Sequence, residues 1–221
     1  MVTTAGLIAM LSAQATPVRR LRPPLVRAGA WLLVAALVMG LLASVYGVRP
    51  DLALRLRQPG FTLALGGALL TGVLAAIAAF YVSLPDRSRA WLLLPLPPLV
   101  LWLSTIGYGC LTDWVDIGPG GIAAGETARC FATLLIASVP SSAVLLVMLR
   151  HTARLQPTVV AMTGGLASAG LAAVALTLFH EIDASLMVLL WHLGATALLV
   201  ALAGLFGRSL FASVAPRRID A

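Results

Sequence analysis

The feature that most constrains this chain is a series of six apolar runs that contain no Asp, Glu or Arg. A helix needs about 20 apolar residues to cross the hydrocarbon core of a bilayer, and a run in lipid must pair its backbone polar groups within itself. The sequence therefore predicts an all-α fold, a polytopic membrane helix bundle with six transmembrane helices. The predicted spans are Ala28–Val48, Gln58–Leu84, Ala90–Thr112, Cys130–Leu149, Leu155–Phe179 and Ala184–Gly207.

Composition supports a membrane protein rather than a soluble one. The 221 residues are 60% hydrophobic and only 10% charged, whereas a soluble domain is usually about a quarter charged. The formal net charge of +7 comes from 15 basic residues, all of them arginine. These arginines lie in the short segments between the apolar runs, as expected at membrane surfaces. We therefore expect membrane lipids as partners and no direct nucleic acid binding.

The placement of charge predicts the orientation. If the N-terminus is cytoplasmic, most arginines lie inside and most acidic residues outside, which is the bias that membrane proteins show. Both termini are then predicted to be cytoplasmic, in a multi-pass protein of a bacterial inner (cytoplasmic) membrane. The chain divides into a cytoplasmic N-terminal segment (1–27), a six-helix transmembrane domain (28–207) and a cytoplasmic tail (208–221). The inside arginines are Arg19, Arg20, Arg22, Arg27, Arg87, Arg89, Arg150, Arg154, Arg208, Arg217 and Arg218.

The N-terminal segment is predicted to hold a short amphipathic helix. Thr4 can cap it, and Leu7, Ile8 and Leu11 share one face at helical spacing. Pro17 is expected to stop it. The helix is too short to span a bilayer. Its apolar face either lies on the membrane surface or docks into the groove of a partner protein, and the spacing alone does not choose between the two.

Two features of the spans bear on packing. Small residues spaced four apart let helix backbones approach closely, and prolines inside a span are expected to kink it. The small-residue stripes are Ala36/Gly40/Ser44, Thr71/Ala75/Ala79 and Gly164/Ser168/Ala172, and the prolines are Pro95, Pro97, Pro98 and Pro140.

The two cysteines are the most informative reactive residues. On the predicted topology Cys110 ends the third helix and Cys130 begins the fourth, both at the periplasmic face, where disulfides are permitted. His180 and Glu181 fall in the outer turn between the fifth and sixth helices, on the same face. Thiols beside acidic residues suit a soft or borderline cation, so Cys110, Cys130 and His180 are candidate metal ligands. Alternatively, the two cysteines are inert or form a structural disulfide, and His180 and Glu181 belong to an ordinary polar turn.

No catalytic motif is visible in the sequence, so we expect no enzyme activity and no resident cofactor, with a thiophilic metal acting only as a signal. The predicted spans contain one titratable side chain of functional interest, His192 in the sixth. An ionisable group within the bilayer is usually kept for function. His192 is either a proton relay, a metal or haem ligand, or a hydrogen-bonded packing residue.

An ordered series of short motifs along nearly the whole chain resembles the NrsF-like proteins, the negative regulators of sigma F. The motifs are Leu7-Ile8-x-x-Leu11 followed by Pro17-Val18-Arg19-Arg20-Leu21, then Arg49-Pro50-Asp51-Leu52, Cys130, Leu149-Arg150, Gly164-Gly165-Leu166, His180 with Trp191, and Gly204-Leu205-Phe206-Gly207-Arg208. The resemblance implies a bacterial anti-sigma factor with six transmembrane helices.

The resemblance also implies a mechanism. Such proteins hold an extracytoplasmic-function sigma factor at the membrane and release it on metal or oxidative stress. Cys130 is then the leading sensor residue, and the face of Leu7, Ile8 and Leu11 is the candidate sigma-docking surface. Glu181 stands where the family usually has a cysteine, and Cys110 is the candidate substitute. Alternative functions are a small membrane transporter or export subunit, favoured by the kinked helices and His192, and a structural membrane subunit.

Overall fold

The computed structural model describes residues 3–14, 21–112, 124–149 and 156–179, with short pieces at 197–198, 201 and 205–206. Within these residues all regular structure is helical, which confirms the predicted fold class. The elements are α1 (Thr4–Ala13), α2 (Pro24–Tyr46), α3 (Leu52–Arg55), α4 (Pro59–Val82), the 3-10 helix η1 (Arg89–Leu93), α5 (Leu96–Thr112), α6 (Ala124–Leu149) and α7 (Pro157–Phe179).

Four helical stretches of the described residues are long and apolar enough to cross a membrane. They coincide with the first, second, third and fifth predicted spans. The fourth predicted span lies within α6, and the sixth falls largely outside the described residues. The total of six spans, the cytoplasmic termini and the division into three parts stay predictions. The four stretches are Pro24–Tyr46, Pro59–Val82, Arg89–Ile106 and Pro157–Phe179.

The third predicted span is not one continuous α-helix. It begins with η1 and breaks at Leu94 and Pro95 before α5 starts at Leu96. Pro97 and Pro98 then occupy the first turn of α5, where a missing N–H leaves no intrahelical hydrogen bond unmade. The prolines therefore set the start of an α-helix at this point. Pro140, in contrast, lies inside α6.

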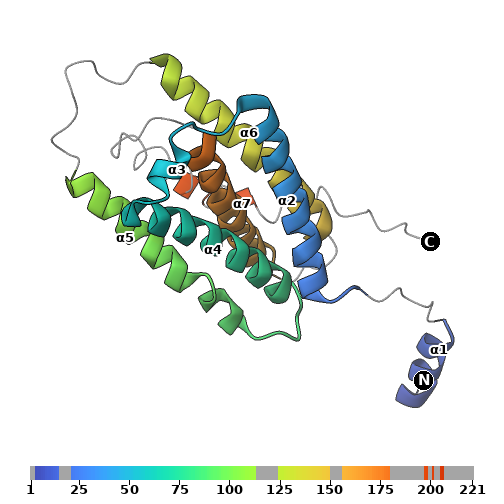
Figure 1. Cartoon of the computed structure of the whole chain (residues 1–221). Helices are drawn as coiled ribbons and strands as arrows, with labels where there is room; N and C mark the ends of the chain where they lie inside the picture. Colours follow the sequence, from blue (N-terminus) through green and yellow to red (C-terminus); the bar gives the residue numbers. More distant parts are fainter. Residues whose placement is uncertain are drawn as a thin grey trace.

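Helices α4 and α7 form the centre of the bundle and have the most extensive contact between any two described helices (Figure 1). Helix α5 packs on α4, α6 packs on α7, and α2 contacts α4, α6 and, less extensively, α7. The start of α2, the ends of α4 and α6 and the start of α7 lie at one end of the bundle. We call this the inner end and the opposite one the outer end, after the predicted orientation.

The backbones of α4 and α7 approach closely at two glycines. A Cβ atom added to Gly170 would lie 2.9 Å from the amide nitrogen of Gly72 and 3.0 Å from the carbonyl oxygen of Ala68. The stripes Thr71/Ala75/Ala79 and Gly164/Ser168/Ala172 are buried, as their spacing predicts. Small residues therefore bring these two central helices together.

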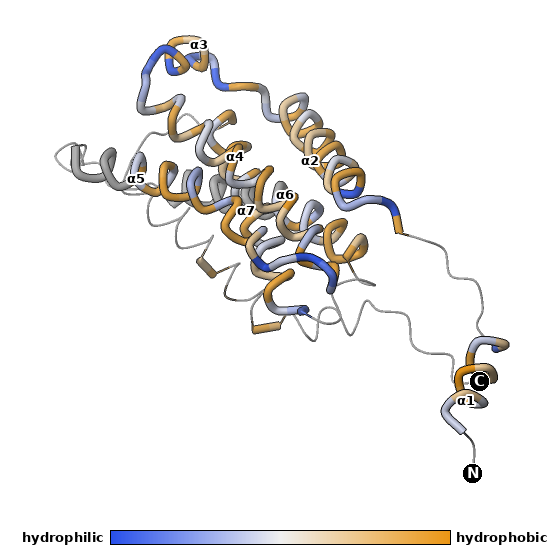
Figure 2. The backbone as a smooth tube through the Cα atoms, turned by 90° about the horizontal axis from the view of Figure 1, so that it is seen from below, coloured by the Kyte–Doolittle hydropathy of each residue, from blue (hydrophilic) through white to orange (hydrophobic). Residues whose placement is uncertain are grey.

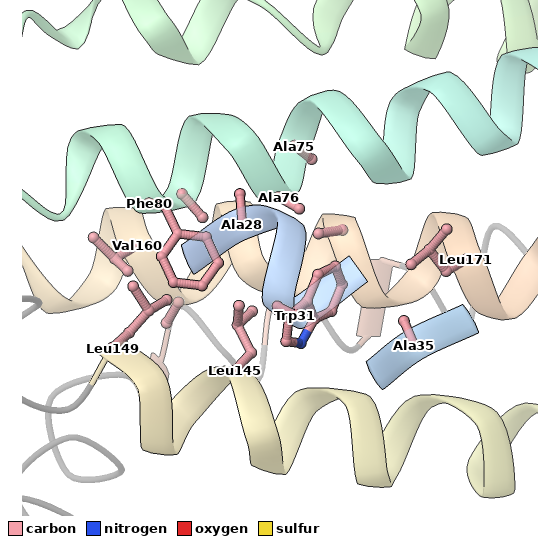
Figure 3. Close-up of a cluster of buried hydrophobic side chains, with 13 residues drawn as sticks. Ala28, Trp31, Ala35, Ala75, Ala76, Phe80, Leu145, Leu149, Val160 and Leu171 are labelled. Carbon is pink, nitrogen blue, oxygen red and sulfur yellow. The ribbon is translucent and has the colours of Figure 1, made fainter. Parts of the chain in front are cut away.

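The prediction that the stripe Ala36/Gly40/Ser44 packs against another helix is wrong for the described part of the chain. Ala36, Gly40 and Ser44 are exposed on α2, and a Cβ on Gly40 would meet no atom within 4 Å. Trp31 instead turns the opposite face of α2 inward, because its ring fills the space between α2 and the central helices (Figure 3). The exposed face carries large apolar side chains suited to lipid, namely Leu33, Leu37, Leu41 and Val45.

The largest buried cluster lies towards the inner end. It joins α2, α4, α6 and α7 through Trp31, Phe80, Leu149 and Val160, all at most 1% exposed (Figure 3). A separate cluster towards the outer end joins Leu42 of α2 to α7. The inner part of α2 is thus packed against three helices, while its outer part rests mainly on α7.

Candidate functional site

Helix α1 forms where the spacing predicts a helix, with its cap one residue earlier than expected, but apolar residues lie on all its sides, so it is not the amphipathic helix that we predicted. The hydroxyl oxygen of Thr3, not that of Thr4, accepts a hydrogen bond from the Gly6 N–H at 3.3 Å. Thr3 has extended backbone angles and Thr4 is the first helical residue, which is the usual geometry of a capping residue. The helix ends at Ala13, before Pro17.

The whole surface of α1 is open. Leu7, Ile8 and Leu11 are 44%, 63% and 57% exposed, and Met10 is 50% exposed. None of the ten residues of α1 is buried, and none is charged. The helix lies away from the bundle (Figures 1 and 2), and apart from Thr4, Gly6 and Ser12 its residues are apolar. A helix that is apolar on all sides is normally covered by protein or lipid.

The structure places the backbone of both cysteines within helices. Cys110 lies in the last turn of α5, as predicted, whereas Cys130 lies in the second turn of α6, which begins six residues earlier than predicted, at Ala124. The side chains of both cysteines lie outside the described residues, as do His180, Glu181 and His192. The sensor and metal-ligand roles of these residues therefore stay predictions. Helix α7 ends at Phe179, directly before His180.

The outer end of α2 is fixed by a buried arginine. Arg49 is 4% exposed, and its guanidinium donates to both carboxylate oxygens of Asp51, at 2.6 and 2.9 Å. Its backbone N–H donates to the carbonyl oxygen of Leu178 at 3.0 Å, and its guanidinium carbon lies 5.7 Å from the centre of the Phe61 ring. Gly47, with φ +75°, reverses the chain between α2 and this residue.

Asp51 is the acidic centre of the outer cluster. Its carboxylate also accepts from Arg55 Nε at 3.2 Å. The hydrogen bonds from Arg49, and then those from Arg55, lower the pKa of the Asp51 carboxyl to about 2, because a positively charged donor favours the ionised form. The two-pronged pair with Arg49 is the stronger type of charge-assisted contact.

A second buried arginine holds the inner end of α2. Arg27, in the first turn of the helix, is 8% exposed. Its Nη2 donates to the carbonyl oxygen of Met148 at the end of α6. Its guanidinium carbon lies 5.1 Å from the centre of the Phe80 ring, within the range of a cation–π contact. Its Nη1 is buried and has no hydrogen-bond partner among the residues that the structure describes.

One turn further along α2, a second hydrogen bond runs to α6. The indole Nε1 of Trp31 donates to the carbonyl oxygen of Ser141 at 2.9 Å. Trp31 is fully buried, and Ser141 directly follows Pro140. The inner half of α2 is therefore attached to α6 by two side chains that both donate to backbone carbonyl groups.

The surface of the inner end has the character of a membrane interface. The rings of Tyr81 and Trp91 stack with their centres 4.0 Å apart, and Arg87 lies over Tyr81 at 6.0 Å. Arg22 and Arg89 are exposed at the same end. Aromatic rings and arginines of this kind gather where a span leaves the bilayer, which fits the predicted position of this end beside lipid headgroups.

Sequence reasoning missed the roles of the two buried arginines. The sequence places Arg27 among the inside charges, and Arg49 and Asp51 among the outside charges and within a family motif, but predicts no partner for any of them. The Arg-x-Asp spacing directly before a helix was a usable signal for local pairing. No comparable signal exists for Arg27, because its partners lie 53 and 121 residues away, at Phe80 and Met148.

Comparison with known proteins identifies the family of this chain. The family model described as NrsF, negative regulator of sigma F, matches residues 11–212. Neither a curated protein nor a solved structure matches the chain. The matched range includes all the described helices from α2 to α7 and the last part of α1. The chain therefore belongs to the NrsF family of negative regulators of sigma F.

Proposed function

We propose that this chain is a membrane-embedded anti-sigma factor that holds an extracytoplasmic-function sigma factor through α1. The observation that carries the proposal is α1 itself, a capped, uncharged helix with every residue exposed, in a member of a family that regulates a sigma factor. Such a helix has apolar surface to cover, and a groove on a partner protein is one surface that covers it. A family of regulators also agrees with the expectation that the chain is not an enzyme.

The signal is proposed to arrive at the outer end. Cys130 near the start of α6 and Cys110 in the last turn of α5 are the proposed sensor residues, with His180 and Glu181 after α7 as their proposed neighbours. A thiophilic metal or an oxidant that reacts with these thiols would favour one packing of the helices over another. Release of the sigma factor requires that the sensed species bind the releasing packing more tightly.

The test is co-purification from membranes. The full-length protein is co-expressed with each extracytoplasmic-function sigma factor of its own organism, and the retained fraction of each sigma factor is measured with and without metal or oxidant. Retention of one of them, with loss on stress, supports the proposal. If the full-length protein retains none of them, the proposal is wrong.

A matched pair of variants separates the two surfaces that α1 can occupy. Leu11→Ser changes the proposed docking face, and Met10→Ser changes an equally large, exposed side chain on another face of the same helix. Docking into a protein groove predicts that Leu11→Ser lowers sigma retention far more than Met10→Ser does. Equal effects of the two variants on membrane association, with no effect on retention, assign α1 to the lipid surface instead.

A further inference from the structure

We propose that Arg27 is a positioning residue for sigma binding: it clips the inner end of α2 onto α6, and the opening of this contact is the step that moves the sigma-docking segment. The inference rests on the proposed function and describes how release of the sigma factor is controlled. It is carried by three observations, namely the incomplete pairing of Arg27, the full pairing of Arg49 at the other end of α2, and the way α2 bridges α6 and α7.

The side chain of Arg27 is buried, but among the described residues not all of its donors have an acceptor. The guanidinium is taken out of water, yet among the described residues it meets one neutral carbonyl oxygen, that of Met148, and the face of the Phe80 ring. Within the described part of the chain its Nη1 has no acceptor. A buried charge is costly unless it is fully paired. An arginine at a helix end has an alternative, because its long side chain can reach water and lipid phosphates at the interface.

The outer end of α2 gives the internal comparison. Arg49 is as buried as Arg27 and also lies over a phenylalanine ring of α4, but it is matched by the Asp51 carboxylate. Its main chain is further tied to Leu178. The Arg49–Asp51 pair joins residues of one loop, so it shows only that a buried guanidinium at one end of α2 is matched by a carboxylate. Among the described residues the guanidinium of Arg27 has no such match, so the inner contact keeps an alternative at the interface and is the one we expect to open.

Helix α2 is therefore tied to two different helices. Its inner half is bonded to α6 through Arg27 and Trp31, and its outer end is bonded to α7 through Arg49. Helix α6 carries Cys130, and α7 ends one residue before His180. A change at the outer end that shifts α6 against α7 must strain the hydrogen bonds of α2 to one helix or to the other. Small shifts of packed helices are a common form of switching.

The consequence reaches the docking segment because Arg27 lies in the first turn of α2, which begins at Pro24. When the inner clip opens, Arg27 moves to the interface and the start of α2 leaves α6. The position and direction of the chain that leads back to α1 then change. The closed clip is the sigma-holding state, and the open clip is the releasing state.

The test uses the full-length protein in its membrane, together with the sigma factor that the wild type retains. Arg27→Gln removes the charge and the fork of donors, Arg27→Lys keeps the charge and a donor, and Arg22→Gln removes an exposed arginine from the same segment as the control. We expect Arg27→Gln to raise unstressed, sigma-dependent reporter expression about tenfold, since the shorter, neutral side chain loses both the hydrogen bond to the Met148 carbonyl oxygen and the cation–π contact with Phe80, and the loss of a contact made by a charged group is of that order. Arg27→Lys should restore most of the retention, and Arg22→Gln should match the wild type.

Trp31→Phe is the second variant, because Trp31 is fully buried and cannot touch a sigma factor. It removes the other hydrogen bond between α2 and α6 and should also raise reporter expression, by a smaller factor. Metal or oxidant stress should raise reporter expression little further in Arg27→Gln, because the contact between α2 and α6 is already open in this variant. Membrane levels of all variants are measured alongside, so that a loss of protein is not scored as release.

The outcomes separate this inference from the proposed function. If the wild type retains no sigma factor, the proposed function itself fails. If the wild type retains and releases one while Arg27→Gln and Trp31→Phe behave like it, the clip is wrong. A loss of retention in Arg27→Gln with Trp31→Phe unchanged also overturns it, because the arginine would then act by direct contact.

Discussion

Replacing Gly170 with alanine places a methyl group between the two central helices of the bundle. The new Cβ would lie 2.9 Å from the Gly72 nitrogen and 3.0 Å from the Ala68 oxygen, whereas ordinary contact begins at 3.4 Å. The backbones of α4 and α7 must therefore separate by about 0.5 Å, the difference between 3.4 and 2.9 Å. Backbone atoms cannot rotate aside as a flexible side chain can, so the strain falls on the whole interface between the two helices.

The expected cost follows from two opposing terms. Overpacking of a well-packed contact costs about 1–3 kcal/mol, and alanine gains about 1 kcal/mol over glycine in helix propensity. Gly66→Ala in α4 is the matched control, because a Cβ there meets no atom within 4 Å and the variant receives the same gain. The difference in unfolding free energy between the two variants isolates the contact, and we expect Gly170→Ala to be less stable by about 1–3 kcal/mol.

The assay is reversible unfolding of the purified protein in mixed micelles with a rising fraction of a denaturing detergent. Tryptophan fluorescence follows the transition, since Trp31 and Trp102 are buried. Equal midpoints for Gly170→Ala and Gly66→Ala would show that α4 and α7 are not in backbone contact at this point, and the account of the central pair given above would be wrong.

Three further predictions use other parts of the molecule. Folding lowers the pKa of Asp51 to about 2, so the contribution of its carboxylate to stability is complete above about pH 4 and is lost as the pH falls towards 2. The difference in unfolding midpoint between wild type and Asp51→Asn should therefore shrink over that range, and a constant difference contradicts the prediction. Phe80→Ala should lower the unfolding free energy by about 3–5 kcal/mol, while Leu37→Ala, on the exposed face of α2, should leave the detergent midpoint nearly unchanged. A membrane-impermeant maleimide should label Cys110 and Cys130 from the periplasmic side only, and more strongly after reduction if they are bridged; labelling from the cytoplasm alone would rule out the sensor proposal.

The sequence predicted the helices because apolar runs and breakers act locally. The first, second, third and fifth runs reappear as helices within a few residues of their predicted ends. Even the short N-terminal helix was found from the spacing of Leu7, Ile8 and Leu11. Where the local signal was misread, at Pro95, the reason is also local, since a cluster of prolines starts an α-helix more readily than it kinks one.

The faces of the helices were harder to predict, because burial depends on partners far away in sequence. The stripe Ala36/Gly40/Ser44 has the same four-residue spacing as Gly164/Ser168/Ala172, yet the first is exposed and the second buried. Arg27 and Arg22 are likewise both arginines near the start of α2, and only Arg27 turns into the bundle. Its direction is decided by a carbonyl group of α6 and a ring of α4, which a single sequence does not reveal.

The distribution of contacts indicates where movement in this bundle can occur. Helices α4 and α7 are held by direct backbone approach at Gly72 and Gly170, so any relative displacement there would strain atoms that cannot rotate away. Helix α2, in contrast, is joined to α6 by two side-chain hydrogen bonds, from Arg27 and Trp31, which can break singly. The buried arginines of the described residues lie at the two ends of α2, so the proposed signal would cross the described part of the bundle as a shift of helices. We therefore expect such a shift to move α2, with the central pair as the fixed frame.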